Sequence, residues 1–207
     1  MSMGSATAFP APSHIALLHR GDAEMQDVAL EFLRIGLDRP SEALFGFGDP
    51  SRSKRLFRAL ELGAGRDLSP EYRTGRIVLG RADPDVDRML EGVIAPLEQF
   101  RAKGFTLVRF VGIVNWNVPD FPPPEDFLWL ESKLSEVFPR FPVIALCLYD
   151  VARLPARAIA YGALETHPLV VSGGALRQNP EFVLFERYFH ERLLRLPWLE
   201  AESARDG

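Results

Sequence analysis

Short runs of hydrophobic residues alternate with longer stretches in which hydrophobic residues recur at helical spacing. Residues 14–19 (HIALLH) form the first run and predict a buried strand, and residues 23–36 carry an apolar stripe that predicts a helix. The alternation continues, and it predicts further strands at 41–48, 76–79, 105–114, 143–149 and 167–171 and further helices at 51–62, 83–102, 125–138, 157–165 and 179–196.

This order of strands and helices predicts an α/β fold. Strands that alternate with helices form a mostly parallel sheet with helices on both faces, which makes three layers. No internal repeat or long linker divides the chain, so residues 14–196 are predicted to form one domain. Residues 1–13 and 197–207 are predicted to be disordered tails.

Charge and cysteine content narrow the function classes. The 207 residues include 24 Lys and Arg against 28 Asp and Glu, and no basic run occurs, so we expect no direct nucleic-acid binding. The single cysteine, Cys147, cannot form an internal disulfide, which favours a reducing compartment. No signal-peptide pattern or apolar stretch of about 20 residues is present, so we expect a cytoplasmic protein that does not enter a membrane.

Ligands of parallel α/β sheets bind beyond the carboxyl ends of the strands. Polar and aromatic residues follow several of the predicted strands. Among them, Trp116 can stack on a planar ligand or fill the core, and Asn115 can donate and accept hydrogen bonds. The candidate ligand-binding residues are His14, His19, Arg20, Asn115, Trp116, Tyr149, Asp150 and His167.

The turn after the first strand lacks the chemistry of a phosphate-binding loop. Such a loop carries several glycines followed by Lys and then Ser or Thr. Residues 19–24 (HRGDAE) contain one glycine and no such pair, and Asp22 and Glu24 would repel a phosphate at the helix N-terminus. Arg20 offsets only part of that charge, so we expect no ATP hydrolysis at this position.

No residue pattern indicates catalysis or a metal site. Cys147 lies in an apolar strand, which favours an inert core thiol over a nucleophile. His14, His19 and His167 could meet as metal ligands, but their spacing matches no known ligand motif. His14 and His167 also fit structural roles, at a strand start and in a turn before Pro168. We therefore expect a protein that is not an enzyme and has no metal or cofactor.

Several segments together resemble the MEDS domain, a sensory domain of methanogens and methylotrophs. They span roughly residues 14–182, and they are HIALLH from His14, EFLRIGL from Glu31, SEALFGFGD from Ser41, GIVNW from Gly112, ESKLSEVFPRFPVIALCLYD from Glu131 and THPLVVSGG from Thr166. The resemblance implies a RecA-like fold related to the KaiC ATPases without the phosphate loop. It also implies a small-molecule sensor for hydrocarbon-derived ligands, since family members are often joined to histidine kinases or DNA-binding modules.

The chain departs from the family pattern at two positions. Family members usually carry Gly-Glu-Met-x-Trp where this chain has Gly112 to Trp116, so Ile113 replaces the acid. They also tend to have a polar residue where this chain has Leu148. Both changes predict a less polar pocket.

Three functions remain open from the sequence. The first is a non-enzymatic sensory or regulatory domain that binds a small apolar or aromatic ligand and signals through a kinase or transcription regulator, or by forming a homo-oligomer. The second is a nucleotide-binding pseudo-ATPase that uses Arg20 and backbone amides. The third is a protein–protein adaptor that docks through Phe185, Tyr188 and Phe189 of the last helix.

Overall fold

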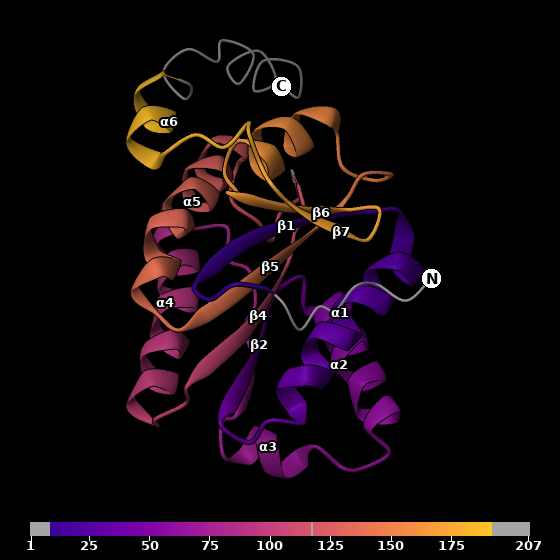
Figure 1. Cartoon of the computed structure of the whole chain (residues 1–207). Helices are drawn as coiled ribbons and strands as arrows, with labels where there is room; N and C mark the ends of the chain where they lie inside the picture. The colour runs from indigo at the N-terminus through magenta and orange to yellow at the C-terminus, as the bar shows by residue number, and fades with distance from the viewer. Residues whose placement is uncertain (1–8, 117, 192–207) are drawn as a thin grey trace.

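The computed structural model describes residues 9–116 and 118–191, and it confirms the predicted α/β fold. One seven-stranded sheet has the order β3-β2-β4-β5-β1-β6-β7 and is parallel except for β7 (Figure 1). The strands are β1 (Ser13–His19), β2 (Glu42–Gly48), β3 (Ile77–Leu79), β4 (Leu107–Ile113), β5 (Val143–Asp150), β6 (Leu169–Ser172) and β7 (Ala175–Gln178).

Helices cover both faces of the sheet, as Figure 1 shows. One face packs against α1 (Gly21–Leu37) and α2 (Pro50–Ala64). The other packs against α4 (Val86–Ala102), α5 (Pro124–Val137) and the π-helix Ala158–Leu164. The short helices α3 (Ser69–Arg73), η2 (Phe138–Arg140) and α6 (Phe185–Glu191) complete the described part of the chain.

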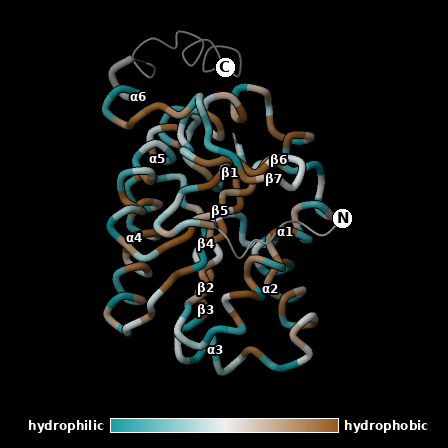
Figure 2. Tube along the Cα trace, viewed as in Figure 1, coloured by the Kyte–Doolittle hydropathy of each residue, from teal (hydrophilic) through white to brown (hydrophobic). Residues whose placement is uncertain are grey.

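The central strands are hydrophobic along their whole length because both of their faces are buried. On β5, Cys147 and Tyr149 face α5, whereas Leu146 and Leu148 face α1. Figure 2 shows the hydrophobic residues gathered along the strands and on the helix sides turned toward them. The sheet therefore separates two cores, and any side chain on a strand belongs to one of them.

The C-terminal part differs most from the sequence expectation. A helix from residue 179 is wrong, because Asn179 ends a hairpin there and donates to the carbonyls of Leu164 and His167. The helix begins instead at Phe185, and residues 192–196 of the expected helix lie outside the described residues. The unpredicted strand β7 follows Gly173 and Gly174, whose positive φ angles of 55° and 77° suit a tight hairpin turn.

Some element boundaries also differ from the expected ones. The segment between the expected helix 51–62 and the expected strand 76–79 contains the short helix α3, which the sequence analysis did not predict. At the N-terminal side, β1 begins at Ser13 and the Phe9 ring packs on Phe32 with centroids 5.9 Å apart. The expected tail segments 1–8 and 197–207 lie outside the described residues.

A buried ion pair lies in the α1 core. Arg109 on β4 donates from Nε to the Glu42 carboxylate on β2 at 2.6 Å, and the two side chains are only 2% and 6% exposed. The guanidinium also lies over the Phe32 ring, 5.0 Å from its centroid. Gly36 on α1 leaves the space for it, because a Cβ there would come within 2.6 Å of Arg109 Cδ.

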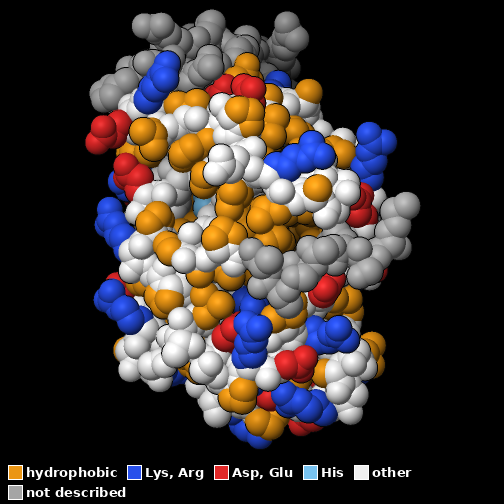
Figure 3. Space-filling view, in the orientation of Figure 1, with side chains coloured by type: hydrophobic (Ala, Val, Ile, Leu, Met, Phe, Trp, Pro, Cys, Tyr) orange, Lys and Arg blue, Asp and Glu red, His pale blue; other side chains and the backbone are white. Residues whose placement is uncertain are grey.

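None of the described helices is long and apolar enough to cross a membrane. On the face seen in Figure 3, Lys and Arg side chains are interspersed with Asp and Glu.

Candidate functional site

Five of the predicted site residues lie at the carboxyl edge of the sheet: His19, Arg20, Asn115, Trp116 and Asp150. His19 and Asp150 are register partners at the ends of β1 and β5. A polar pocket of about 320 Å³ opens at this edge, and Asn115, Trp116 and Asp150 line it together with Asp49, Ser51, Arg52, Arg55, Val114, Arg153, Leu154 and Pro155. The buried Trp116 therefore does have a cavity beside it.

The charges at this carboxyl-edge pocket largely compensate one another. Arg52 and Arg153 both approach Asp22 Oδ1, at 3.5 and 3.4 Å. Arg153 also lies 3.5 Å from the buried Asp150 carboxylate. Asp49 accepts from the backbone N–H groups of Ser51 and Arg52 and so caps α2. Two of the three arginines that line the pocket are therefore already paired with carboxylates.

The other three predicted site residues lie deeper, between the sheet and α5. His14, Tyr149 and His167 are all fully or almost fully buried. The His14 and His167 rings lie 3.8 Å apart between centroids, and the Tyr149 ring packs edge-on against His167 at 5.5 Å. The structure thus divides the predicted residues between two places.

Two residues that the sequence analysis did not select as site residues join the deeper group. Glu131 of α5 and Cys147 of β5 lie beside the two histidines, and one ligand atom from each of the four residues is within 4.8 Å of the others. His14 Nε2 is 3.4 Å from Cys147 Sγ and 3.5 Å from Glu131 Oε2, which is also 3.5 Å from His167 Nε2. We call His14, Glu131, Cys147 and His167 the His–Glu–Cys cluster.

Hydroxyl groups hold the outer edges of both imidazoles. His14 Nδ1 is 2.9 Å from Ser135 Oγ of α5, and His167 Nδ1 is 2.9 Å from Thr166 Oγ1. The π-helix supports this side of the cluster, since Gly162 O accepts from Thr166 and, at 2.9 Å, from the Tyr149 hydroxyl. Single-turn π-helical segments occur frequently at functional sites.

Burial dominates the electrostatics of the cluster. It lowers the pKa of His14 to about 3, and burial together with the neighbouring His14 lowers the pKa of His167 to about 3. Burial raises the pKa of Glu131 to about 7, although His167 opposes that change. Burial, with Glu131 nearby, also raises the pKa of the Cys147 thiol well above its usual value. At neutral pH the two imidazoles and the thiol are therefore uncharged.

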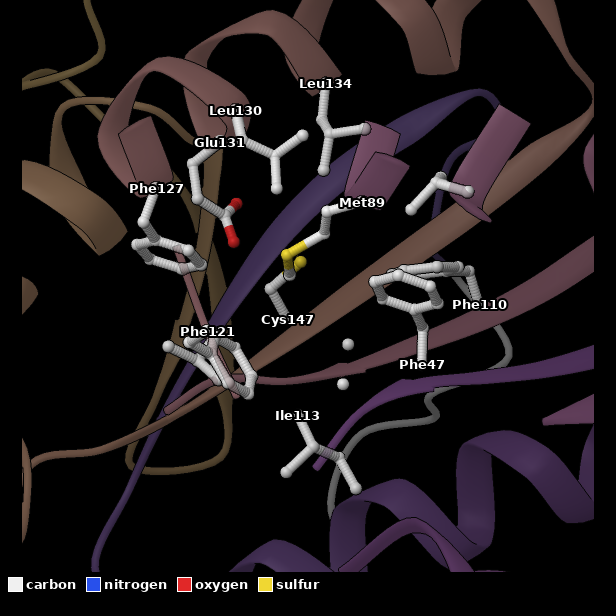
Figure 4. Close-up of a pocket in the computed structure, with 14 residues that line it drawn as sticks. Phe47, Met89, Phe110, Ile113, Phe121, Phe127, Leu130, Glu131, Leu134 and Cys147 are labelled. Carbon is white, nitrogen blue, oxygen red and sulfur yellow. The ribbon is translucent and has the colours of Figure 1, made fainter. Parts of the chain in front are cut away.

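An apolar pocket of about 20 Å³ adjoins the cluster, which is space for about one water-sized molecule. Glu131 and Cys147 supply its only ionisable groups among lining residues that are otherwise apolar or glycine: Phe47, Gly48, Met89, Val93, Phe110, Gly112, Ile113, Val114, Phe121, Phe127, Leu130 and Leu134. Figure 4 shows Glu131 pointing from α5 toward Cys147. Ile113 borders this pocket, but its side chain packs in the α1 core, as does that of Leu148, which does not line the pocket.

One feature of the sequence does indicate Glu131, namely its position in the apolar stripe of α5. On α5, Phe127, Leu130, Leu134 and Phe138 form the buried stripe, and Glu131 lies within that stripe while only 4% exposed. An acidic residue in the apolar stripe of a helix has to be paired, protonated or bound to a ligand. Its partners come from distant strands, which helical spacing alone does not reveal.

The proposed docking residues of the last helix pack against the protein itself. Tyr188 is fully buried and donates to Tyr161 O at 3.2 Å. The Phe185 ring packs edge-on against Trp129 and carries the Lys133 ammonium over its face. The side chain of Phe189 lies outside the described residues. The two described aromatics are therefore parts of the domain's own packing.

The sheet order and the two helix layers define a RecA-like α/β protein. A KaiC-like protein from the hyperthermophilic archaeon Pyrococcus horikoshii OT3 has a similar solved structure, with a TM-score of 0.57 and 14% identity over 84% of this chain and 83% of that one. At that identity the likeness shows the fold alone.

The model of the MEDS family, the MEthanogen/methylotroph, DcmR Sensory domain, matches residues 13–168, and the chain belongs to this family. This match confirms the resemblance inferred from the sequence and gives the chain a sensory or regulatory role. A comparison with curated proteins found no match.

Proposed function

We propose that this domain is a non-enzymatic sensor that binds a small, weakly polar organic molecule in the apolar pocket beside Glu131 and Cys147. One observation carries the proposal: a cavity between sheet and helices is lined by apolar residues except for these two groups. Small-molecule sites have this composition, in which apolar walls provide burial and a few polar groups fix orientation. This proposed site differs from the one expected from the sequence, because it lies on the α5 side of the sheet and not at the carboxyl edge.

The size of the pocket limits the ligand. A cavity of about 20 Å³ holds about one water-sized molecule, so an organic ligand of a few non-hydrogen atoms fits only when side chains move. Met89 and Leu130 can enlarge it by changing rotamer, since both are flexible side chains. A short hydrocarbon derivative with one hydrogen-bonding group fits this description, with Glu131 binding the polar end.

A route from the pocket to the surface runs through aromatic residues. Phe121, in the loop before α5, and Phe127 of α5 both line the pocket. The Trp116 ring packs edge-on against Phe127 with centroids 5.9 Å apart, and Trp116 also lines the carboxyl-edge pocket. A ligand that displaces Phe121 or Phe127 would shift the loop between β4 and α5, and we propose that a partner protein, such as a histidine kinase or transcription regulator, recognises that change.

The proposal can be tested by NMR titration with methanol, ethanol, 1-propanol and xenon as probes. Gly48 and Gly112 line the pocket, so their amide signals should shift, while those of Gly63 and Gly104 on the outside of the domain should stay. Xenon reports apolar space in general, and the alcohols add a polar end. Trp116 fluorescence should change with the same concentration dependence.

A matched pair of glycine variants separates pocket binding from general effects. In Gly112→Ala the new Cβ would lie 3.0 Å from Phe110 and 3.2 Å from Cys147 Sγ, so it fills the pocket floor. In Gly63→Ala the Cβ meets nothing within 4 Å. We expect the first variant to bind the probes at least about 10-fold more weakly, as expected when about 1.4 kcal/mol is lost, and the second to bind normally. Equal binding by both variants would refute the assignment of this pocket.

The carboxyl-edge pocket supports a second candidate, the nucleotide-binding pseudo-ATPase. Its volume and the three arginines that line it favour an anionic ligand. Against this, Arg52 and Arg153 already face Asp22, and only Arg20 separates β1 from α1. We expect no thermal shift with millimolar ATP or GTP and magnesium, and a clear stabilisation would favour the second candidate.

A further inference from the structure

The two buried histidines have their protons on the outer ring nitrogens. The Ser135 hydroxyl donates its one proton to Thr166 O, so it can only accept a hydrogen bond from His14 Nδ1–H. Likewise the Thr166 hydroxyl donates to Gly162 O and accepts from His167 Nδ1–H. Each neutral imidazole carries one proton, and therefore both Nε2 atoms present bare lone pairs to the interior of the cluster.

These lone pairs converge on the Glu131 carboxyl group, which can satisfy at most one of them when it is protonated. His14 Nε2 and His167 Nε2 both lie 3.5 Å from Glu131 Oε2. Within the described part of the chain, neither Glu131 Oε2 nor His167 Nε2 has a hydrogen-bond partner. Acceptors facing one another in a dry interior repel unless a proton or a cation lies between them. The Cys147 thiol supplies at most one proton, at 3.4 Å from His14 Nε2.

We propose that the His–Glu–Cys cluster binds one divalent transition-metal ion of the zinc type, through His14 Nε2, His167 Nε2, Cys147 Sγ and a Glu131 carboxylate oxygen. This differs from the sequence expectation of no metal. It does not depend on the ligand proposed above, because the ion would be held by protein groups alone.

The distances suit such an ion. Ligand atoms that lie about 2.1 Å from a tetrahedral zinc ion are about 3.4 Å from one another. Three separations between ligand atoms of the cluster are 3.4, 3.5 and 3.5 Å, and the whole set lies within 4.8 Å. A small inward movement of the remaining pairs would close the tetrahedron, so the fold needs no rearrangement.

The chemistry of the donors agrees with the geometry. Two imidazoles, a thiolate and a carboxylate favour Zn²⁺, Co²⁺ or Fe²⁺ over the hard ions Mg²⁺ and Ca²⁺. The hydrogen bonds from Nδ1 to Ser135 and Thr166 are the outer contacts that orient metal-binding histidines. Glu131 and Cys147 also line the apolar pocket, so the ion would stand at its wall.

The test uses the full chain and Co²⁺ as a spectroscopic probe. The reduced protein is unfolded in denaturant with a chelator, freed of both, and refolded with one equivalent of Co²⁺ or Zn²⁺, which removes any problem of access to the buried cluster. We expect one Co²⁺ per chain, with the intense visible bands of a tetrahedral site and a thiolate-to-cobalt charge-transfer band. Metal analysis of protein purified without refolding gives an independent measurement.

Variants locate the ion. Cys147→Ser should lose the charge-transfer band, and Ser135→Ala, which leaves all four ligands in place, should weaken Co²⁺ binding about 10- to 100-fold. His19→Gln is the matched control, because His19 is also buried on β1 but lies outside the cluster. It should bind Co²⁺ like the unaltered chain.

Binding should also release protons. The thiol must lose its proton to bind the ion, so at least the Cys147 proton should leave on binding and the affinity for Co²⁺ should rise with pH. A correctly refolded chain that takes up no Co²⁺ would overturn the proposal. The lone pairs of the cluster would then be satisfied by a shared proton alone. Binding with an unchanged spectrum in Cys147→Ser would overturn it as well, by placing the ion elsewhere.

Discussion

The His14 and His167 rings pack against each other beneath α5, with centroids 3.8 Å apart and planes tilted by 40°, although one residue belongs to β1 and the other precedes β6. Both rings turn Nε2 toward the same oxygen of Glu131. Three buried titratable groups thus lie together, and each affects the protonation of the others. The pH dependence of folding follows directly from this arrangement.

In the metal-free protein, the free energy of unfolding should decrease as pH falls from about 6.5 toward 4.5. The two histidines have pKa values of about 3 in the folded chain and about 6.5 in the unfolded chain, so the unfolded chain takes up two protons that the folded chain does not. Glu131 acts in the opposite direction, since the folded chain keeps its proton up to about pH 7 and the unfolded chain loses it near 4.5. These three groups together contribute a net difference of about one proton, or a slope of about 1.4 kcal/mol per pH unit, and His19, whose pKa burial also lowers, adds to it in the same direction. Urea unfolding with a chelator at several pH values measures it.

Glu131→Gln should make that slope steeper and should raise stability at pH 8. The variant removes the proton that the folded chain retains, so the slope between pH 4.5 and 6.5 increases by about 1.4 kcal/mol per unit. At pH 8 it also removes a buried carboxylate charge. Glu136→Gln, an exchange on the same helix at a residue paired with Lys133, is the control and should leave the slope unchanged. A variant less stable than the unaltered chain at pH 8 would show that the carboxylate is stabilised in the metal-free protein.

The Glu42–Arg109 ion pair should respond differently to single and double replacement. Arg109→Met removes the buried partner of the Glu42 carboxylate, which keeps the half-exposed Arg39 at 3.0 Å, so the loss in the free energy of unfolding should be smaller than the about 3–5 kcal/mol of an unpaired buried charge. Glu42→Leu combined with Arg109→Met removes both charges and should restore most of that loss, since apolar side chains of similar size fit the α1 core. Urea unfolding of the two single variants and the double variant gives the coupling energy, and additive losses would contradict this account.

The sequence predicted the parallel sheet and its helices because their hydrophobic patterns are long and regular. The buried strands β4 and β5 are continuous apolar runs, and α4 has a regular apolar stripe, so each pattern is typical of one kind of element. The prediction failed where local chemistry competes with pattern. Asn179 ends a hairpin through its side-chain amide, and the four residues of β7 are too few and too exposed to show a period.

The candidate site could be predicted only in part for a related reason. His14, Tyr149 and His167 were selected as polar residues near strand ends, and they do meet. Glu131 lies on a helix far along the chain, and its place over Cys147 depends on how α5 crosses the sheet. Sequence periodicity shows which face of a helix is buried, but it does not show which strand that face covers.

Two glycines with positive φ should differ sharply in their tolerance of alanine. Gly48 has φ of 112° and a Cβ there would lie 2.2 Å from the backbone oxygen of Ile113, which cannot move away without breaking the sheet. Gly65 has φ of 63° and open space around it. We expect Gly65→Ala to cost about 1 kcal/mol and Gly48→Ala about 3 kcal/mol or more. Thermal unfolding compares the two directly, and equal losses would mean that φ alone decides the cost.

Cys147 should react with thiol reagents only when the chain unfolds. Its side chain is buried, and burial raises the pKa of the thiol, so the native protein holds almost no thiolate at neutral pH. The rate of labelling of the metal-free chain by a disulfide reagent should therefore follow the population of unfolded molecules and rise with urea. Because Cys147 is the sole cysteine, the same chain in denaturant is its own control and should react at once.

Zn²⁺ should slow the native reaction further if the thiolate is a metal ligand, since the ion stabilises the folded state and occupies the sulfur. Rapid labelling of the native, metal-free chain would instead show that the thiol opens to solvent through the adjoining pocket.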